Sequence, residues 1–122
     1  ELLAGFDGVH MVSVYGVEIP GTEGRAGMAA LLMEEGRTLD PAALYRYAVE
    51  HLAVYAVPAF VRLVREMDVT GTFKLRKTDL QAQAYDPARV DDTMYYLDRE
   101  RGTYTVLDAD AYRRMQAGEV RF

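Results

Sequence analysis

Two lysines, Lys74 and Lys77, stand three positions apart in a chain whose other twelve basic residues are all arginine. A lysine ammonium is a compact point charge, and at a reactive site it is not interchangeable with the planar guanidinium of arginine. Both lysines fall in the segment TGTFKLRKTDL (70–80), where a loop containing glycine leads into an expected helix. A positive charge held there could stabilise negative charge on a reactant. Residue type alone favours an exposed, idle lysine, so the segment by itself leaves both interpretations open.

Charge is distributed unevenly along the chain. Five basic and two acidic residues lie between Phe60 and Lys77, although the whole chain carries a net charge of −5. This basic stretch fits a patch that faces a small anion, and it fits ordinary solvated charges equally well. The acidity of the whole chain argues against a nucleic-acid-binding domain, because such domains cluster Lys and Arg to meet phosphates.

Composition argues against several other classes. The chain has 122 residues, half of them hydrophobic, so we expect one domain with one ordinary core. It has no cysteine, and His10 and His51 are isolated, so we expect no disulfide framework, no thiolate nucleophile and no metal site. The longest apolar stretch, 52–64, is interrupted by Pro58 and Arg62 and is shorter than the roughly 20 residues that span a membrane. With no leader pattern either, we expect a soluble cytoplasmic protein.

The clearest local signal is a helix start at Asp40-Pro41. Aspartate can cap a helix, and proline suits the first turn because its missing N–H would have no partner there. Apolar residues recur every four positions from Leu44 to Leu52, which predicts a helix to about Ala53. The tyrosines nearby are interpreted as core or helix-face aromatics rather than substrate ligands: Tyr45, Tyr47 and Tyr55.

Strands are predicted where β-branched, aromatic or continuous apolar residues run between turn signals. The run 11–15 is strand-like and is ended by Gly16, and a polar loop covers 20–25. The run 28–33 is continuously apolar and suits a buried strand, so the two runs can form a hairpin. Later elements are a short helix over 77–84 interrupted by Pro87, a hairpin of 94–97 with 103–107, and a helix from Asp108 through Met115.

The segment TGTFKLRKTDL (70–80) resembles the last motif of adenylate-forming enzymes. In that motif a glycine is followed by a lysine, and then by a basic residue and a leucine. Two residues between the glycine and the lysine make it similar to the branch of fatty-acid transport proteins and very-long-chain acyl-CoA synthetases. Further blocks match that branch in order and cover nearly the whole chain: VYGVEIPGTEGRAGMAAL (14–31), YAVPAFVRL (55–63), YYLD (95–98) and AGEVRF (117–122).

The resemblance also decides between two interpretations of one segment. Residues 60–67 fit helical spacing by periodicity alone, whereas their β-branched content fits a strand, and the resemblance implies a strand. The expected fold is therefore α+β across 1–122. It has a small central sheet of about three strands packed with helices, followed by a C-terminal β-hairpin and a short helix.

The resemblance implies the mobile C-terminal domain of an ATP-dependent fatty acyl-CoA synthetase. In such an enzyme a fatty carboxylate attacks ATP, which comes with Mg, to give acyl-adenylate and pyrophosphate, and CoA then displaces AMP. The C-terminal domain closes over the active site in two orientations, one for each step. Because the chain begins at Glu1 rather than Met, we expect a fragment. Its partner is the N-terminal domain of the same polypeptide, which binds ATP and fatty acid, and the isolated fragment should be inactive.

Lys74 is the residue that the resemblance makes catalytic, since the matching lysine reaches into the active site during adenylation. Residues that the resemblance places near the nucleotide or in support of the loop are Gly71, Thr72, Arg76 and Lys77. Arg25 also belongs to a branch pattern, but for it we favour an ordinary turn role. We expect no metal ligand here, and the full-length protein can lie peripherally at a membrane. The alternative is a noncatalytic α+β ligand-binding or protein-interaction module with Lys74 on a surface turn.

Overall fold

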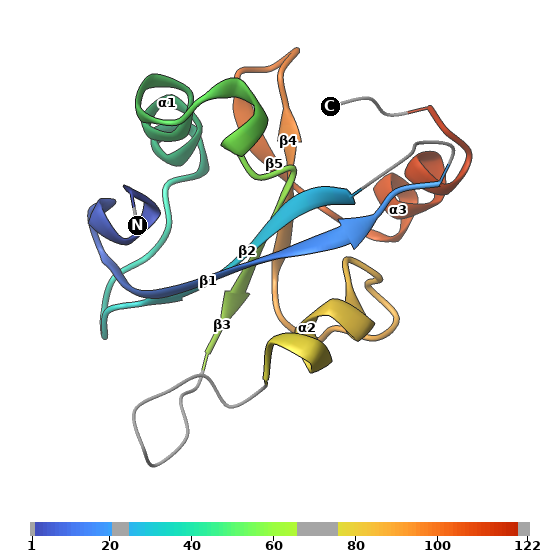
Figure 1. The fold of residues 1–122 in the computed structure, drawn as a ribbon, viewed down its shortest axis with the longest axis horizontal. Coiled ribbons are helices and arrows are strands. Elements are labelled where there is room, and N and C mark those ends of the chain that lie inside the picture. The colour runs from blue at the N-terminus through green and yellow to red at the C-terminus, as the bar shows by residue number, and fades with distance from the viewer. Residues whose placement is uncertain (1, 21–24, 66–75, 120–122) are drawn as a thin grey trace.

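The protein folds around one mixed β-sheet with helices on both faces (Figure 1). The structure, a computed structural model, describes residues 2–20, 25–65 and 76–119. None of the helices within those ranges is long and apolar enough to cross a membrane. The elements are η1 (Leu2–Gly5), β1 (Val9–Glu18), β2 (Arg25–Met33), α1 (Pro41–His51), η2 (Val54–Ala56), β3 (Phe60–Val64), α2 (Lys77–Gln83), β4 (Met94–Asp98), β5 (Thr103–Val106) and α3 (Ala109–Gln116).

The α+β class and the C-terminal hairpin are confirmed, but the sheet is larger than the expected three strands or so, because the hairpin belongs to it. The sheet has five strands in the order β1-β2-β3-β4-β5. β1 and β2 form the predicted antiparallel hairpin, and β2 pairs in parallel with β3 after the chain crosses through α1. The C-terminal hairpin joins this sheet, because β4 pairs antiparallel with β3 and β5 with β4. Without β4, β3 would be left with an unpaired edge.

Side chains of the central strands alternate between two hydrophobic cores. On β2, Met28 and Ala30 face the core beneath α2 and α3, while Ala29 and Leu31 face the core beneath α1. A strand buried on both faces needs apolar residues at every position, which explains the continuous apolar run. β3 follows the same rule with Phe60 on the first face. The predicted strand is therefore confirmed for Phe60–Val64, and residues 66–67 lie outside the described structure.

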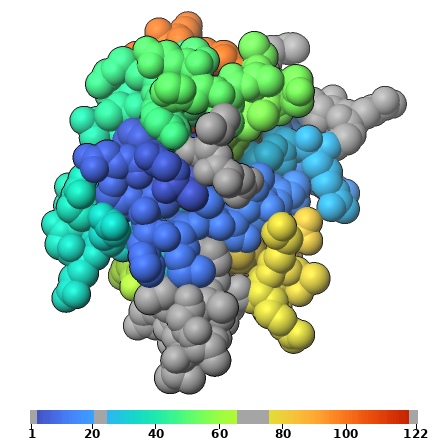
Figure 2. Space-filling view, turned by 60° about the vertical axis from the view of Figure 1, so that its left-hand side comes forward, coloured from blue at the N-terminus to red at the C-terminus, as the bar shows by residue number. Residues whose placement is uncertain are grey.

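The face beneath α1 also holds the start of the chain. Phe6, just after η1, packs against Tyr47 of α1 with ring centroids 5.3 Å apart. Figure 2 shows η1, in dark blue, directly below α1 and η2, in green. η1 and α1 thus cover one side of the sheet together, and α2 and α3 are left for the other.

Both predicted aspartate caps are present. The Asp40 carboxylate accepts hydrogen bonds from the backbone N–H groups of Ala42 and Ala43 at 3.1 and 3.2 Å. Asp108 accepts one from the N–H of Ala111 at 2.8 Å. These bonds satisfy first-turn donors that have no partner inside a helix, which is why the two starts could be read from sequence.

Several predicted ends are wrong by a few residues. The first strand does not stop at Gly16, because Gly16 pairs with Gly27 and the ladder continues to Glu18. A side chain at position 16 would collide with the stem of Arg25, whose Cδ would lie 2.9 Å from an added Cβ. The helices α1 and α2 end at His51 and Gln83 rather than at Ala53 and Ala84, and the last strand and helix end at Val106 and Gln116.

The three tyrosines around α1 have different environments. Tyr45 and Tyr47 are half-buried on α1, as expected of helix-face aromatics. Tyr55 is 94% exposed on η2, so a core position for it is wrong. The helix ends at His51, and the chain then turns, which takes Tyr55 out of the helical spacing on which the expectation rested.

Tyr104 offers a test of the core, because its buried hydroxyl donates a hydrogen bond of 2.7 Å to the backbone carbonyl of Pro58. Tyr104→Phe leaves that carbonyl without its donor and should lower the free energy of unfolding by about 1–3 kcal/mol in urea titrations. The same change at exposed Tyr55 should stay within about 0.5 kcal/mol. Equal effects at both positions would contradict the assignment of this bond.

Candidate functional site

The six residues singled out from the sequence divide into two groups. Lys74, Gly71 and Thr72 lie outside the described residues. Arg76, Lys77 and Arg25 lie within them, and all three are exposed. The described part of the site consists of the residues on either side of the segment 66–75 and the surface around them.

Those two ends belong to β3 and α2. β3 ends at Val64 and is followed by Arg65, while Arg76 stands at the start of α2 and Lys77 is its first residue. The N–H of Arg76 donates to the Asp79 carboxylate at 3.3 Å, which helps to fix the helix start. The end of β3 and the start of α2 lie on the same side of the molecule, at the bottom of Figure 1.

Next to these ends lies a buried arginine that the sequence reasoning did not recognise as important. Arg62 of β3 is 5% exposed, and its Nε lies 2.9 Å from Asp92 Oδ2. Its Nη1 donates to Gln83 Oε1 of α2 at 2.6 Å. Arg65 Nε lies 3.2 Å from the other carboxylate oxygen of Asp92. We call these four residues the Arg62 cluster; it joins β3, α2 and the turn before β4.

A charged residue inside the apolar run FVRLV was a signal that could have pointed to this cluster. A buried guanidinium requires a carboxylate partner, so Arg62 implied one. The partner itself could not be named, because Asp92 is 30 residues away in the chain.

The Arg62 cluster also changes the interpretation of the basic stretch. Two of its five bases, Arg62 and Arg65, are paired with Asp92, and Arg62 is withdrawn from the surface. Arg76 and Lys77, at the start of α2, are the other two described bases of that stretch. Both are exposed, and neither pairs with Asp92. An anion-facing patch would therefore be smaller than the sequence count implied.

A second buried polar group lies near the cluster. The hydroxyl of Tyr15 on β1 has no hydrogen-bond partner among the described residues. Burial raises the pKa of Tyr15 from 10.0 to about 12, the charge of Arg62 opposes this rise, and the charge of Asp92 adds to it. The neutral phenol is thus the form that the folded protein favours.

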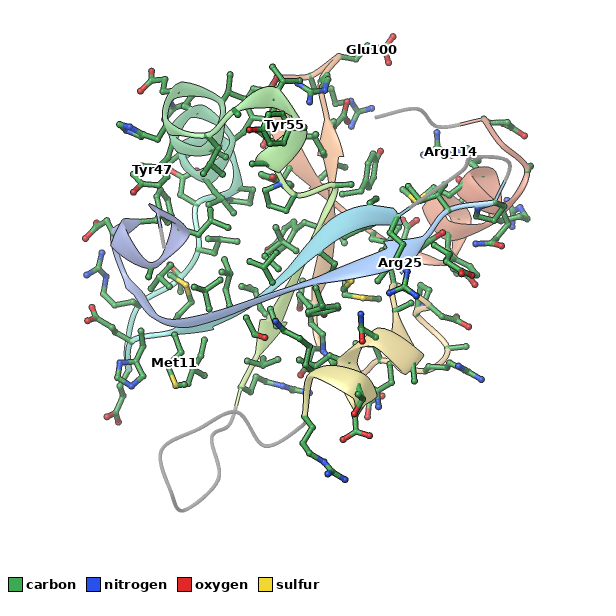
Figure 3. The ribbon with its side chains drawn as sticks, in the orientation of Figure 1. Met11, Arg25, Tyr47, Tyr55, Glu100 and Arg114 are labelled. Carbon is green, nitrogen blue, oxygen red and sulfur yellow. The ribbon has the colours of Figure 1, made fainter. Side chains whose placement is uncertain are left out.

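Arg25 lines a separate groove of about 970 Å³ between the end of β1, α2 and α3. Figure 3 shows Arg25 directed from the start of β2 toward the side of the sheet that carries α2. Two hydrogen bonds tie α2 and the following turn to β1 across this groove, from Gln81 to the Gly16 carbonyl at 3.3 Å and from Tyr85 to the Glu18 carbonyl at 3.2 Å. Arg76 and Lys77 do not line it, so the structure does not bring Arg25 together with them.

Within residues 2–20, 25–65 and 76–119, no group of three or more His, Asp or Glu side chains is arranged to hold a metal ion. The exposed basic groups at the start of α2 are Arg76 and Lys77, and the carboxylate of Asp92 is paired with Arg62 and Arg65. Basic groups of this kind can bind and orient anions at neutral pH.

Comparison with known proteins identifies relatives for both halves of the chain. The family model described as AMP-binding enzyme C-terminal domain matches residues 1–74. Long-chain fatty acid transport protein 1 of Mus musculus is 44% identical over 108 residues, covering 88% of this chain and 17% of its own length. Long-chain fatty acid transport proteins 3 of Homo sapiens and 6 of Mus musculus are 40% and 35% identical, each over 99% of this chain. The chain spans 17–20% of the length of these three relatives.

Two solved structures share the fold over part of the chain. The amide bond synthetase McbA from Marinactinospora thermotolerans has a TM-score of 0.54 and 30% identity, over 66% of this chain and 16% of that protein. ATP-bound MatB from Rhodopseudomonas palustris has a TM-score of 0.55 and 23% identity, over the same shares. About a third of the present chain has no counterpart in either alignment.

The raised pKa of Tyr15 predicts how stability depends on alkaline pH. An unfolded tyrosine ionises near its ordinary pKa of 10.0, whereas in the fold it stays neutral up to about 12. The unfolded state therefore binds fewer protons above pH 10, and stability falls as the pH rises through this window. Tyr15→Phe should flatten that fall by up to about 1.4 kcal/mol per pH unit in denaturant titrations. An unchanged slope would contradict the burial of this phenol.

Proposed function

Because the chain belongs to the AMP-binding enzyme C-terminal domain family, we propose that it is the C-terminal domain of an ATP-dependent fatty acyl-CoA synthetase, with Lys74 acting in the adenylation step. The single observation that carries this proposal is the match to fatty acid transport proteins at 35–40% identity over 99% of the chain. That match continues past residue 74, where the family model ends.

The chemistry of adenylation explains why a lysine is useful here. A fatty acid has a pKa near that of a glutamate side chain, about 4.3, so at neutral pH it is already a carboxylate and needs no general base. One carboxylate oxygen attacks the α-phosphorus of ATP, the bond to the β-phosphate oxygen breaks, and pyrophosphate leaves. Both reactants are anions. An ammonium beside the carboxylate and the α-phosphate offsets their repulsion and fixes their relative position.

The second step has different requirements. The CoA thiol gives up its proton to solvent and its sulfur attacks the acyl carbon of the adenylate; the bond from that carbon to the phosphate oxygen breaks, AMP leaves, and a thioester forms. No anionic carboxylate has to approach a phosphate in this step, so Lys74 should matter less. ATP, with its Mg ion, and CoA are thus substrates of the full protein, and the remainder of the polypeptide supplies the surface against which this domain works.

The neighbouring residues have supporting roles in this proposal. Arg76 and Lys77, exposed at the start of α2, can face nucleotide phosphates or the N-terminal domain. Gly71 and Thr72 precede Lys74 in the same segment. Arg25 has its stem packed over Gly16 beside a separate groove, which supports the structural role that we favour for it.

Lys74→Ala in the full-length parent tests the proposal. Acyl-adenylate formation should fall by about 100- to 1,000-fold, the typical loss when one group that stabilises developing charge is removed. Conversion of preformed acyl-adenylate and CoA to the thioester should be largely kept. Arg46→Ala, an exposed change on α1, is the matched control and should leave both rates at the wild-type level. Unchanged adenylation in Lys74→Ala would favour the noncatalytic module instead.

A further inference from the structure

A residue just before the C-terminal hairpin makes a buried contact with the end of β3 that precedes the segment 66–75. The family model ends at residue 74, before this hairpin, whereas the match to fatty acid transport proteins 3 and 6 covers 99% of the chain. Asp92, just before β4, is the carboxylate that neutralises Arg62. We infer that the Arg62–Asp92 pair is a positioning device that fixes both ends of the segment carrying Lys74; this inference rests on the proposed function.

The pair acts on both ends through named contacts. On the β3 side, Asp92 accepts from Nε of Arg62 at 2.9 Å and from Nε of Arg65 at 3.2 Å, and Arg65 is the last described residue before the segment. A backbone hydrogen bond joins the same two segments, from the N–H of Leu63 to the Thr93 carbonyl at 2.9 Å. The end of β3 is therefore held by residues 92 and 93 through both side chain and backbone.

On the α2 side, Arg62 reaches the helix through Gln83. Its Nη1 donates to Gln83 Oε1 at 2.6 Å, so one guanidinium bonds Asp92 and α2 at the same time. α2 has only seven residues, and Leu80 anchors its apolar side at 1% exposure. A helix this short moves as one body, so holding Gln83 also holds Lys77 at its start.

Stability alone does not account for a buried pair of this kind. Desolvating two charges offsets most of their attraction, and well-packed apolar residues of similar volume often stabilise a fold as well or better. What the pair adds is a fixed geometry. The planar guanidinium of Arg62 has donors in set directions, and these determine where the side chains of Asp92 and Gln83 lie. A catalytic ammonium needs such placement, since an error of about 1 Å can cost on the order of 100-fold in rate.

The test compares Asp92→Asn with Asp98→Asn in the full-length parent. Asp92 precedes β4 and Asp98 is its last residue; their side chains are 14% and 11% exposed, and each pairs with an arginine. Asp98 binds Arg101 and Thr105 within its own hairpin, with no contact to β3 or α2 in the interactions found for it. Asp98→Asn therefore controls for the loss of a buried carboxylate in the same hairpin.

Two half-reactions and the melting temperature are measured for each variant. Asp92→Asn should lower kcat for acyl-adenylate formation by about 10- to 100-fold, with the KM for ATP and the rate from preformed acyl-adenylate near wild type. Asp98→Asn should lower the melting temperature less, because Arg101 is 74% exposed and stays solvated, and it should keep the wild-type ratio of the two rates. Asp92→Glu, which keeps the charge, should recover part of the adenylation rate.

Gln83→Leu keeps the test decisive if Asp92→Asn fails to fold. It removes only the hydrogen bond from Arg62 to α2 and leaves the Arg62–Asp92 ion pair intact. It should show the same selective loss in adenylation, but a smaller one. Equal losses in both half-reactions, or a wild-type ratio in both Asp92→Asn and Gln83→Leu, would overturn the positioning role. Failure of the proposed function looks different, since Lys74→Ala would then adenylate at the wild-type rate.

Discussion

The buried charge of Arg62 constrains how the rest of the fold is assembled. Its guanidinium lies on a central strand at 5% exposure, so it needs a carboxylate inside the protein. Asp92 reaches it because β4 lies beside β3, and Gln83 reaches it because α2 packs across the same end of the sheet. Strand, helix and hairpin are thus placed relative to one another where the segment 66–75 begins and ends. The C-terminal hairpin is thus part of the one sheet and of its core.

The parts of this fold that could be predicted from the sequence are those with local causes. Asp40 and Asp108 mark helix starts because a cap needs only the next few N–H groups. The apolar run of β2 marks a strand because both faces of that strand are covered. Whether β3 is a strand or a helix could not be decided from its own residues. Its five residues, four apolar and one arginine, fit both periodicities. The family resemblance implied a strand, which is correct.

The parts that could not be predicted depend on residues distant in the chain. That the C-terminal hairpin extends the main sheet follows from pairing such as Phe60 with Tyr96, which no local pattern encodes. The choice of Asp92 as partner for Arg62 is equally non-local. Tyr55 looked like a core aromatic only while the helix was assumed to continue to Ala53. For the site, sequence reasoning named the segment of Lys74, but it missed the Arg62 cluster on which the ends of that segment depend.

The most direct test of the role of Lys74 is a structure of the full-length parent with a nonhydrolysable acyl-adenylate analogue in the adenylation state. If Lys74 acts in that step, its Nζ will lie within hydrogen-bond distance, about 2.7–3.2 Å, of an oxygen on the carboxyl or the α-phosphate of the analogue. A Lys74 ammonium in solvent, with another cation in that position, would contradict the assignment of catalysis to this residue.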